Sequence, residues 1–204
     1  MVFDVLIIGG GAAGMQCALV LGSASNKSFA KDKNVGIVMH QKASHLQTAL
    51  FNNVLGLNPG KLGSEILQEG KEQLQNLYPS VTQIDTEKVF EVSGNSGDFT
   101  VTTNKNSYKA KLVVVALGYT NLFDIEGLNE YVIPHKRSMP EKQRVQLSNK
   151  DHIVAEGIYV AGTLAGWSSQ FAIAAGSGAQ VATDILTLWN GGNFTKVHDK
   201  VEIV

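Results

Sequence analysis

The sequence is poor in cysteine and has no long apolar run. Cys17 is the single cysteine among 204 residues, so the chain can form no internal disulfide and holds no CxxC redox pair. One cysteine suits a reducing compartment, and we expect a cytoplasmic protein. No run of about 18 apolar residues occurs, so no membrane span is expected. Asp4 stands where a secretory signal would carry basic residues, which argues against a targeting segment.

Charge of one sign is also lacking. The formal net charge is −1 and the lysines are scattered, which argues against nucleic-acid or anionic-membrane partners. The histidines show no metal-ligand spacing, so no metal is expected. With 44% hydrophobic residues, the length suits a single domain, predicted over residues 1–192, followed by a polar tail over 193–204.

What is present begins with a strand, a glycine turn and a helix. "FDVLIIGGG" is an apolar strand pattern that ends in glycines, and "AAGMQCALVLG" after it is a helix pattern that ends near Gly22. "VGIVMH", residues 35–40, reads as a second buried strand. Together these segments predict a βαβ unit in a parallel sheet flanked by helices, an α/β Rossmann-like fold.

Gly9, Gly11 and Gly14 form GxGxxG between that strand and helix. Gly9 permits the tight turn, Gly11 lets a pyrophosphate approach the backbone, and Gly14 lets the helix lie close to the strand. The phosphates then meet free N–H groups at the helix start, at Ala12 and Ala13. The motif alone is weak, and a structural glycine turn is the alternative, but its context favours dinucleotide binding.

The end of the second strand carries no acid. A carboxylate usually binds the adenosine ribose there, whereas this chain has His40 and Gln41. Either side chain could hydrogen-bond a ribose, and a solvent-facing strand end is the alternative. Neutral residues at this place weaken the case for NAD and leave FAD open.

The remaining elements are less regular. A helix is predicted over residues 64–77 with Ser64 as its N-cap, then short strands at 81–84, 88–93, 99–103 and 112–117. "SGNSGD" between the second and third is typical of a hairpin turn. Residues 129–151 have no clear period and predict a long irregular connection. A strand at 158–161 and a helix at about 170–189 follow.

These segments resemble, in order, the FAD-binding half of thioredoxin reductase-like flavoproteins, within the pyridine nucleotide-disulfide oxidoreductases. The resemblance rests on "DVLIIGGGAAG", "NNVLGLNPGKLGSEIL", a β-meander ending in "LVVVALG", "EGIYVAGT" and "SSQFAIAAGSGAQVATDIL". It covers about three quarters of the chain, and the first and last segments are the specific ones. It implies an FAD-binding domain with a parallel sheet and a β-meander.

The resemblance also implies roles for residues. The loop Gly9–Gly14 would hold the FAD pyrophosphate, and His40 or Gln41 would face the adenosine ribose. The other positions it implies near FAD are Asn53, Val89, Ala116, Gly118, Gly162, Thr163, Gln170 and Phe171. Thr163 replaces the usual acid beside the ribityl chain, so weaker FAD binding is expected. No catalytic residue is assigned.

One departure from the family is larger. Only about 28 residues lie between Leu128 and Gly157, where relatives insert an NADPH domain, and a βαβ unit alone takes about 30. The glycines around Gly176 follow no strand, so they form no second nucleotide loop. The sequence therefore predicts slow, unsaturable flavin reduction by NADPH alone and no disulfide reduction.

Three functions stay open at this stage. The favoured one is a small FAD-dependent oxidoreductase that receives hydride or electrons from free NAD(P)H or from a partner protein. The others are a non-catalytic FAD-binding subunit or sensor, and a stand-alone binder of NAD or another nucleotide. A homodimer is also left open, and the physiological substrate is not encoded in any motif.

Overall fold

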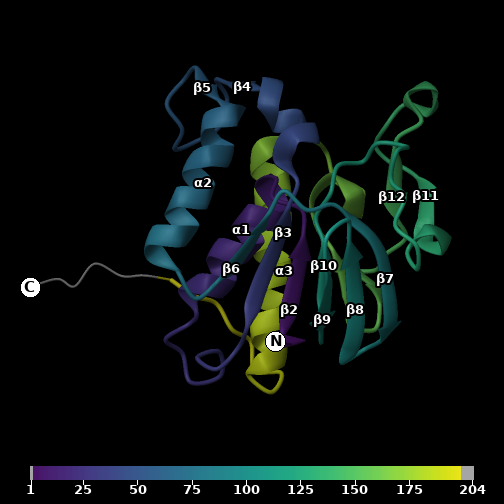
Figure 1. Ribbon diagram of the computed structural model, residues 1–204. Coiled ribbons are helices and arrows are strands. Elements are labelled where there is room, and N and C mark those ends of the chain that lie inside the picture. The colour runs from purple at the N-terminus through teal and green to yellow at the C-terminus, as the bar shows by residue number, and fades with distance from the viewer. Residues whose placement is uncertain (1, 199–204) are drawn as a thin grey trace, which may run out of the picture.

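The computed structural model describes residues 2–198 and shows a layered α/β fold (Figure 1). The central sheet has the order β13-β14-β10-β2-β3-β6, parallel throughout except for β13 at one edge. Its strands are β2 (Val5–Ile8), β3 (Val35–Met39), β6 (Thr82–Asp85), β10 (Val113–Val115), β13 (Ile153–Ala155) and β14 (Ile158–Val160). This confirms the Rossmann-like class predicted from the sequence.

The middle strands are apolar because both faces of the sheet are covered. Every residue of β2, β3 and β10 is buried, which explains their continuous Val/Ile/Leu runs. Helices α1 (Ala12–Ser23) and α3 (Phe171–Trp189) pack on one face. A second apolar cluster fills the other face, beneath the smaller β-sheet.

The smaller sheet has the order β1-β9-β8-β7 and contains the meander. Its strands are β1 (Val2–Phe3), β7 (Val89–Asn95), β8 (Asp98–Thr103) and β9 (Ser107–Ala110). The hairpin turn between β7 and β8 is confirmed, with Asn95 opposite Asp98. The sequence prediction that 112–117 ends the meander was wrong. β9 ends it, and its polar sequence SYKA hid it, whereas the buried β10 joins the parallel sheet.

Asp4 lies where the chain passes from the smaller sheet to the larger one. Its carboxylate accepts a hydrogen bond from the Asn34 backbone N–H at 2.9 Å and from Lys111 Nζ at 3.0 Å. Burial raises the pKa of Asp4. The Asn34 N–H, Lys111 and Lys33 together lower this pKa by more than burial raises it, so the net shift is downward. This buried charge therefore ties β1, β3 and the segment after β9 together.

Helices α1 and α3 touch backbone to backbone. A Cβ on Gly178 of α3 would lie 1.9 Å from the carbonyl oxygen of Ala13, so only glycine permits this approach. By length and composition α3 could cross a membrane, but core helices meet the same criteria, and Val181 and Ile185 are fully buried against α1 and the sheet. The glycines near Gly176 lie within this helix, as the sequence predicts.

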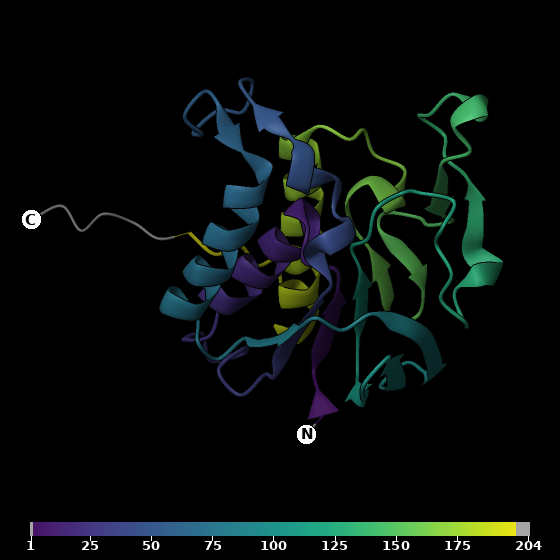
Figure 2. The ribbon, with the colours of Figure 1, turned by 45° about the horizontal axis from the view of Figure 1, so that its top comes forward.

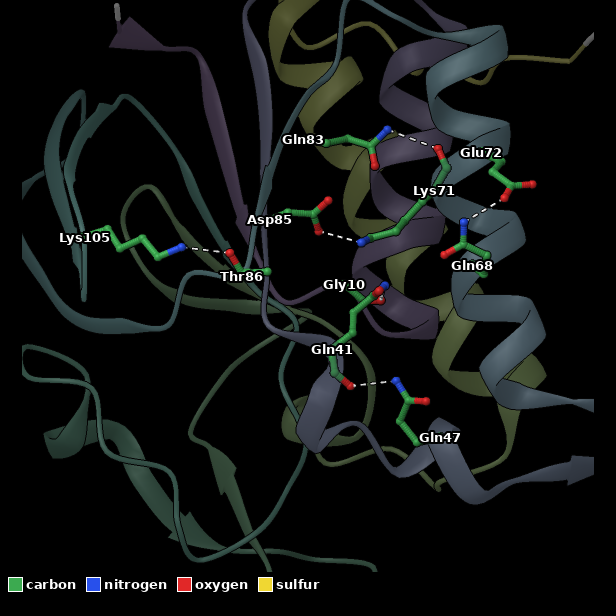
Figure 3. A network of polar contacts seen from close by, with 10 residues as sticks. All are labelled: Gly10, Gln41, Gln47, Gln68, Lys71, Glu72, Gln83, Asp85, Thr86 and Lys105. Carbon is green, nitrogen blue, oxygen red and sulfur yellow. Dashed lines mark hydrogen bonds and ion pairs between the residues drawn. The ribbon is translucent and has the colours of Figure 1, made fainter.

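Helix α2 (Gly63–Leu77) covers the far edge of the sheet beside β6. Lys71 pairs with Asp85 at 2.6 Å, and its carbonyl accepts a bond from Gln83 at 3.1 Å (Figure 3). The predicted N-cap Ser64 is wrong by two residues. Leu62 is the cap, and the Glu65 carboxylate accepts its N–H at 3.2 Å.

Residues 129–151 were predicted as an irregular connection, and this is wrong. They contain the antiparallel pair β11 (Val132–Pro134) and β12 (Val145–Leu147), joined by a loop. This hairpin lies at the edge of the molecule opposite α2 (Figures 1 and 2). A second short pair, β4 (Leu50–Phe51) and β5 (Lys61–Leu62), precedes α2. Residues 193–198 of the predicted tail form no helix or strand, and 199–204 lie outside the described residues.

Candidate cofactor site

A cavity of about 830 Å³ opens at the carboxyl ends of the parallel strands. This edge is where open α/β sheets bind their ligands. The cavity runs from the glycine loop after β2 to the start of α3, and the segments after β3, β6, β10 and β14 also line it. Its volume lies within the range of small-molecule and cofactor sites.

The glycine loop has the geometry expected of a phosphate site. Gly9 has φ +116°, and a Cβ there would lie 2.4 Å from the Ala116 carbonyl oxygen. A Cβ on Gly14 would lie 1.8 Å from the Gly9 carbonyl oxygen, so Gly14 allows α1 to meet the strand. By contrast, a Cβ on Gly11 would meet no protein atom within 4 Å, because Gly11 borders the cavity.

Gly11 is also the N-cap of α1, and no side chain caps this helix. The N–H groups of the first turn, at Ala12 and Ala13, therefore lack a side-chain acceptor at the cavity wall. Four backbone N–H groups at a helix start have no partner within the helix, and the helix dipole favours an anion there. The loop offers both space and donors for a phosphate.

Of the two candidates after β3, Gln41 is already engaged. Its Nε2 donates to the Gly10 carbonyl oxygen at 2.7 Å, and its backbone carbonyl oxygen accepts a hydrogen bond from Gln47 Nε2 at 3.2 Å (Figure 3). Gln41 thus braces the glycine loop. His40 is exposed, also lines the cavity, and is the neighbour better placed to meet a ligand.

An acid that sequence analysis missed, Glu87, lines the same end of the cavity near Val89. Its carboxylate accepts hydrogen bonds from Thr103 Oγ1 at 2.5 Å, Asn106 Nδ2 at 2.8 Å and Tyr108 OH at 3.0 Å. Burial raises the pKa of Glu87, but these donors lower it more. The acid is therefore ionised, and its carboxylate oxygens already have hydrogen-bond donors from the protein. These bonds hold the segment before β7 against β8 and β9.

Gly162 and Thr163 follow β14 and line the cavity beside the start of α1, where a Cβ on Gly162 would lie 2.9 Å from the Ala13 Cβ. Gly162 has φ +76°, and its N–H donates to Ser177 Oγ at 2.8 Å. The Thr163 carbonyl is 2.9 Å from Nε2 of the buried His135, whose Nδ1 accepts the Arg137 N–H at 3.1 Å. These two bonds fit the neutral ring with its proton on Nε2. Thr163 is thus anchored through its backbone, which leaves its side chain for the cavity.

The start of α3 also lines the cavity. Phe171 lines the cavity and packs edge-to-face on Phe51, with ring centroids 5.1 Å apart. Gln170 is the N-cap of α3, without a side-chain bond to the helix, but Ser169 and Phe171 line the cavity in its place. Asn53, also proposed near the cofactor, is exposed in the β4–β5 loop and is not a lining residue. Ala116 and Gly118 also line the cavity, and Ala116 lies against Gly9 of the glycine loop.

Arg144 is a lining residue that sequence analysis missed, because it lies in the segment predicted as irregular. Its guanidinium stacks over the Tyr119 ring, 4.9 Å from the centroid. Its Nε is buried and has no hydrogen-bond partner within residues 2–198. No other buried side-chain nitrogen or oxygen in this part of the chain lacks a hydrogen-bond partner. A buried donor without an acceptor is costly, so an acceptor from a ligand is the expected partner.

Two further features of the described residues bear on the chemistry open to this site. Cys17 is fully buried in α1, and burial raises the pKa of its thiol, which makes it a poor nucleophile. Across residues 2–198 no three His, Cys, Asp or Glu side chains are grouped as a metal site. The cavity lining combines the glycine loop with aliphatic and aromatic side chains, the acids Glu87 and Asp124, and the cations Lys88 and Arg144.

The sequence pattern of the pyridine nucleotide-disulphide oxidoreductases matches residues 3–179, most of the chain. The chain belongs to this family. Its members include thioredoxin reductase-like proteins, and the chain has the fold of their FAD-binding domain, without the NADPH domain and without CxxC. No match is found among curated proteins.

Solved structures give the same fold. An oxidoreductase from Agrobacterium tumefaciens is 19% identical with a TM-score of 0.71, over 92% of this chain and 99% of that one. A thioredoxin reductase from Gloeobacter violaceus is 15% identical with a TM-score of 0.71, over 98% and 99%. A ferredoxin-flavin thioredoxin reductase from Clostridium acetobutylicum is 16% identical with a TM-score of 0.66, over 92% and 98%. At these identities the likeness concerns the fold.

Proposed function

We propose that this chain binds FAD in the cavity described above and works as a small flavoprotein oxidoreductase. The observation that carries the proposal is the continuous cavity between two uncapped helix starts, α1 and α3, in a family of flavin-dependent enzymes. FAD is a long molecule with a dianionic pyrophosphate and a ring that becomes anionic on reduction. Two helix N-termini in the wall of one cavity match that charge distribution.

The residues present fit this cofactor. Gly11 leaves room for a pyrophosphate, and the N–H groups of Ala12 and Ala13 would hold it. The adenosine end would lie by His40 and Val89, and the ribityl chain by Thr163. The unpartnered Nε of Arg144 calls for an acceptor, which a flavin carries at its ring carbonyls.

At the ring end, Phe171 and Phe51 would pack on the isoalloxazine and keep water from one of its sides. Bound FAD supplies hydride and electron transfer, and the chain's own part is to bind, orient and tune it. Arg144 and the start of α3 would place positive charge near the ring, which favours the reduced, anionic form. Electrons would come from NAD(P)H or a partner protein, since the 204 residues hold one dinucleotide loop and one cysteine.

The test is the absorbance spectrum of the purified protein, followed by release of the cofactor and chromatography. We expect flavin bands and FAD rather than FMN. A colourless protein that takes up no added FAD would refute the proposal, and uptake of NAD instead would favour a nucleotide binder. Anaerobic addition of electron donors then separates an oxidoreductase from a non-catalytic FAD module, because only the oxidoreductase bleaches and turns over.

A further inference from the structure

A second, smaller pocket lies beside the ring end of the cofactor cavity. It measures about 290 Å³ and is formed mainly by the loop of the β11–β12 hairpin. We call it the hairpin pocket, and its lining residues are Tyr119, His135, Arg137, Ser138, Met139, Lys142, Trp167, Ser168 and Ser169. The segment that forms it lies at the place in the chain where, from the family resemblance, relatives insert an NADPH domain.

The segment that forms most of the hairpin pocket is strongly basic, and two of its cations, Arg137 and Lys142, line the pocket. The segment 135–144 reads HKRSMPEKQR, with four cations, Lys136, Arg137, Lys142 and Arg144, against one acid, Glu141. None of these cations forms an ion pair with any residue between 2 and 198. In a protein with net charge −1, such a local excess of unpaired positive charge is out of proportion to the whole.

Two of the cations are held in place by an indole. Lys136 Nζ lies 5.6 Å and Arg137 Cζ 5.4 Å from the Trp167 ring. The Lys136 backbone N–H donates to Gln146 Oε1 at 2.8 Å, and the His135 side chain fixes both the Arg137 N–H and the Thr163 carbonyl. The positive charges are therefore positioned by the fold, which reduces the entropy lost when an anion binds.

The hairpin pocket adjoins the cofactor cavity. Tyr119 and Ser169 line both, and Ser169 comes just before the start of α3. Tyr119 contacts His135 on one side, with ring centroids 5.1 Å apart, and carries Arg144 on its face. A molecule whose charged group sat in the hairpin pocket would therefore have its other end next to the ring end of the cofactor cavity.

We propose that the hairpin pocket binds a phosphate group of a small molecule that reacts at the ring end of the cofactor cavity. A small phosphate ligand fits better than an acidic protein, because the cations surround a concave space with serine hydroxyls rather than a flat patch. The proposal rests on the proposed function. A phosphate bound in the hairpin pocket would supply part of the binding energy that NADPH normally gains far from the reacting centre. The missing NADPH domain removes that binding energy, which is why the sequence predicts unsaturable flavin reduction by NADPH.

The experiment is a titration with inorganic pyrophosphate of protein saturated with FAD, followed by the fluorescence of Trp167. Trp189, the other tryptophan, lies at the far end of α3, so Trp167→Phe should remove the response. We expect saturable binding to the parent protein. Arg137→Gln combined with Lys142→Gln should raise the half-saturating concentration about tenfold or more, because two charged hydrogen-bond donors are lost.

The matched control is Lys27→Gln combined with Lys31→Gln. It makes the same change in net charge at exposed lysines in the loop before β3. We expect pyrophosphate binding to change less than about twofold there, since exposed charges interact weakly at a distance in salt. Equal weakening by both double variants would show that only net charge acts, and would overturn the proposal.

Calorimetric competition distinguishes the source of the phosphate. Displacement of pyrophosphate by NADPH but not by NADH would assign the pocket to a 2′-phosphate, displacement by both to a dinucleotide pyrophosphate, and by neither to a free phosphorylated metabolite. No response of Trp167 to pyrophosphate would refute the proposal. It would also be refuted if the Arg137→Gln, Lys142→Gln variant lost binding of an acidic carrier protein while its binding of pyrophosphate stayed unchanged. A colourless protein that still binds pyrophosphate in the hairpin pocket would refute the FAD proposal alone.

Discussion

Gly11→Val is the sharpest test of where the phosphates lie, because the structure separates its effect on binding from its effect on folding. Gly11 has φ −83°, a region open to any residue, and a Cβ there meets no protein atom within 4 Å. Replacing a glycine N-cap by an apolar residue costs about 0.5–1 kcal/mol of stability. That corresponds to a fall in Tm of about 1–4 °C for a chain of this size.

The effect on FAD should be much larger. A branched side chain at Gly11 would fill the space through which the pyrophosphate reaches the N–H groups of α1. Two lost charged hydrogen bonds at about 1.5–3 kcal/mol each weaken binding roughly 10² to 10⁴-fold. Titration of the apoprotein with FAD, followed by flavin fluorescence, measures the Kd, and circular dichroism during heating measures the Tm.

Gly14→Ala is the matched control. A Cβ there would lie 1.8 Å from the Gly9 carbonyl oxygen, so the helix must move away from the strand and the whole fold should be destabilised. Gly11→Val should therefore lose FAD with an almost unchanged Tm, whereas Gly14→Ala should lose stability first. Full FAD occupancy in Gly11→Val would refute the assignment of the phosphates to this loop.

Three further predictions concern single side chains. Thr163→Asp should keep FAD and tighten it about fivefold by offering a charged acceptor to a ribityl hydroxyl; loss of FAD on titration would instead place the phosphates at this position. Arg144→Gln should weaken FAD about 10- to 100-fold by removing a charged donor, with Lys142→Gln, confined to the hairpin pocket, as the control; an unchanged Kd would mean that Arg144 Nε serves another partner. Asp4→Asn should lower the free energy of unfolding by about 1–3 kcal/mol at pH 7, because the Asp4 charge accepts two hydrogen bonds. The pKa of Asp4 is lowered in the folded state, so its contribution is present above about pH 4 and is lost as the pH falls further. Urea unfolding should therefore show the difference from the parent narrowing as the pH falls below about 4, and a difference that stays constant there would contradict this reasoning.

The fold class and the glycine loop follow from local sequence. Strand β2, the glycine turn and α1 are adjacent in the chain, and Gly9 and Gly14 are required by close backbone contacts within this short segment and with Ala116. The buried strands β3 and β10 could be recognised because both of their faces are covered, which demands uninterrupted apolar runs. Such features depend on neighbours within a few residues.

The ring end of the cavity depended on tertiary structure. Arg144, Tyr119 and Thr163 meet there from segments far apart in the chain, and no periodicity marks them. The same holds for Glu87, whose three donors come from β8, from β9 and from the turn between them. Asn53 and Gln170 show the converse, because a place in a motif did not bring either side chain to the cavity wall.

The hairpin of residues 132–147 shows most clearly what the sequence by itself determined. The sequence established that this connection is too short for a nucleotide-binding domain, because a βαβ unit has a minimum length. It did not show a β-hairpin, since β11 and β12 have three residues each, too few for alternation to be read. Only the folded chain places its cations around Trp167 and beside Tyr119, because packing across the molecule, not local pattern, decides which side chains share a pocket.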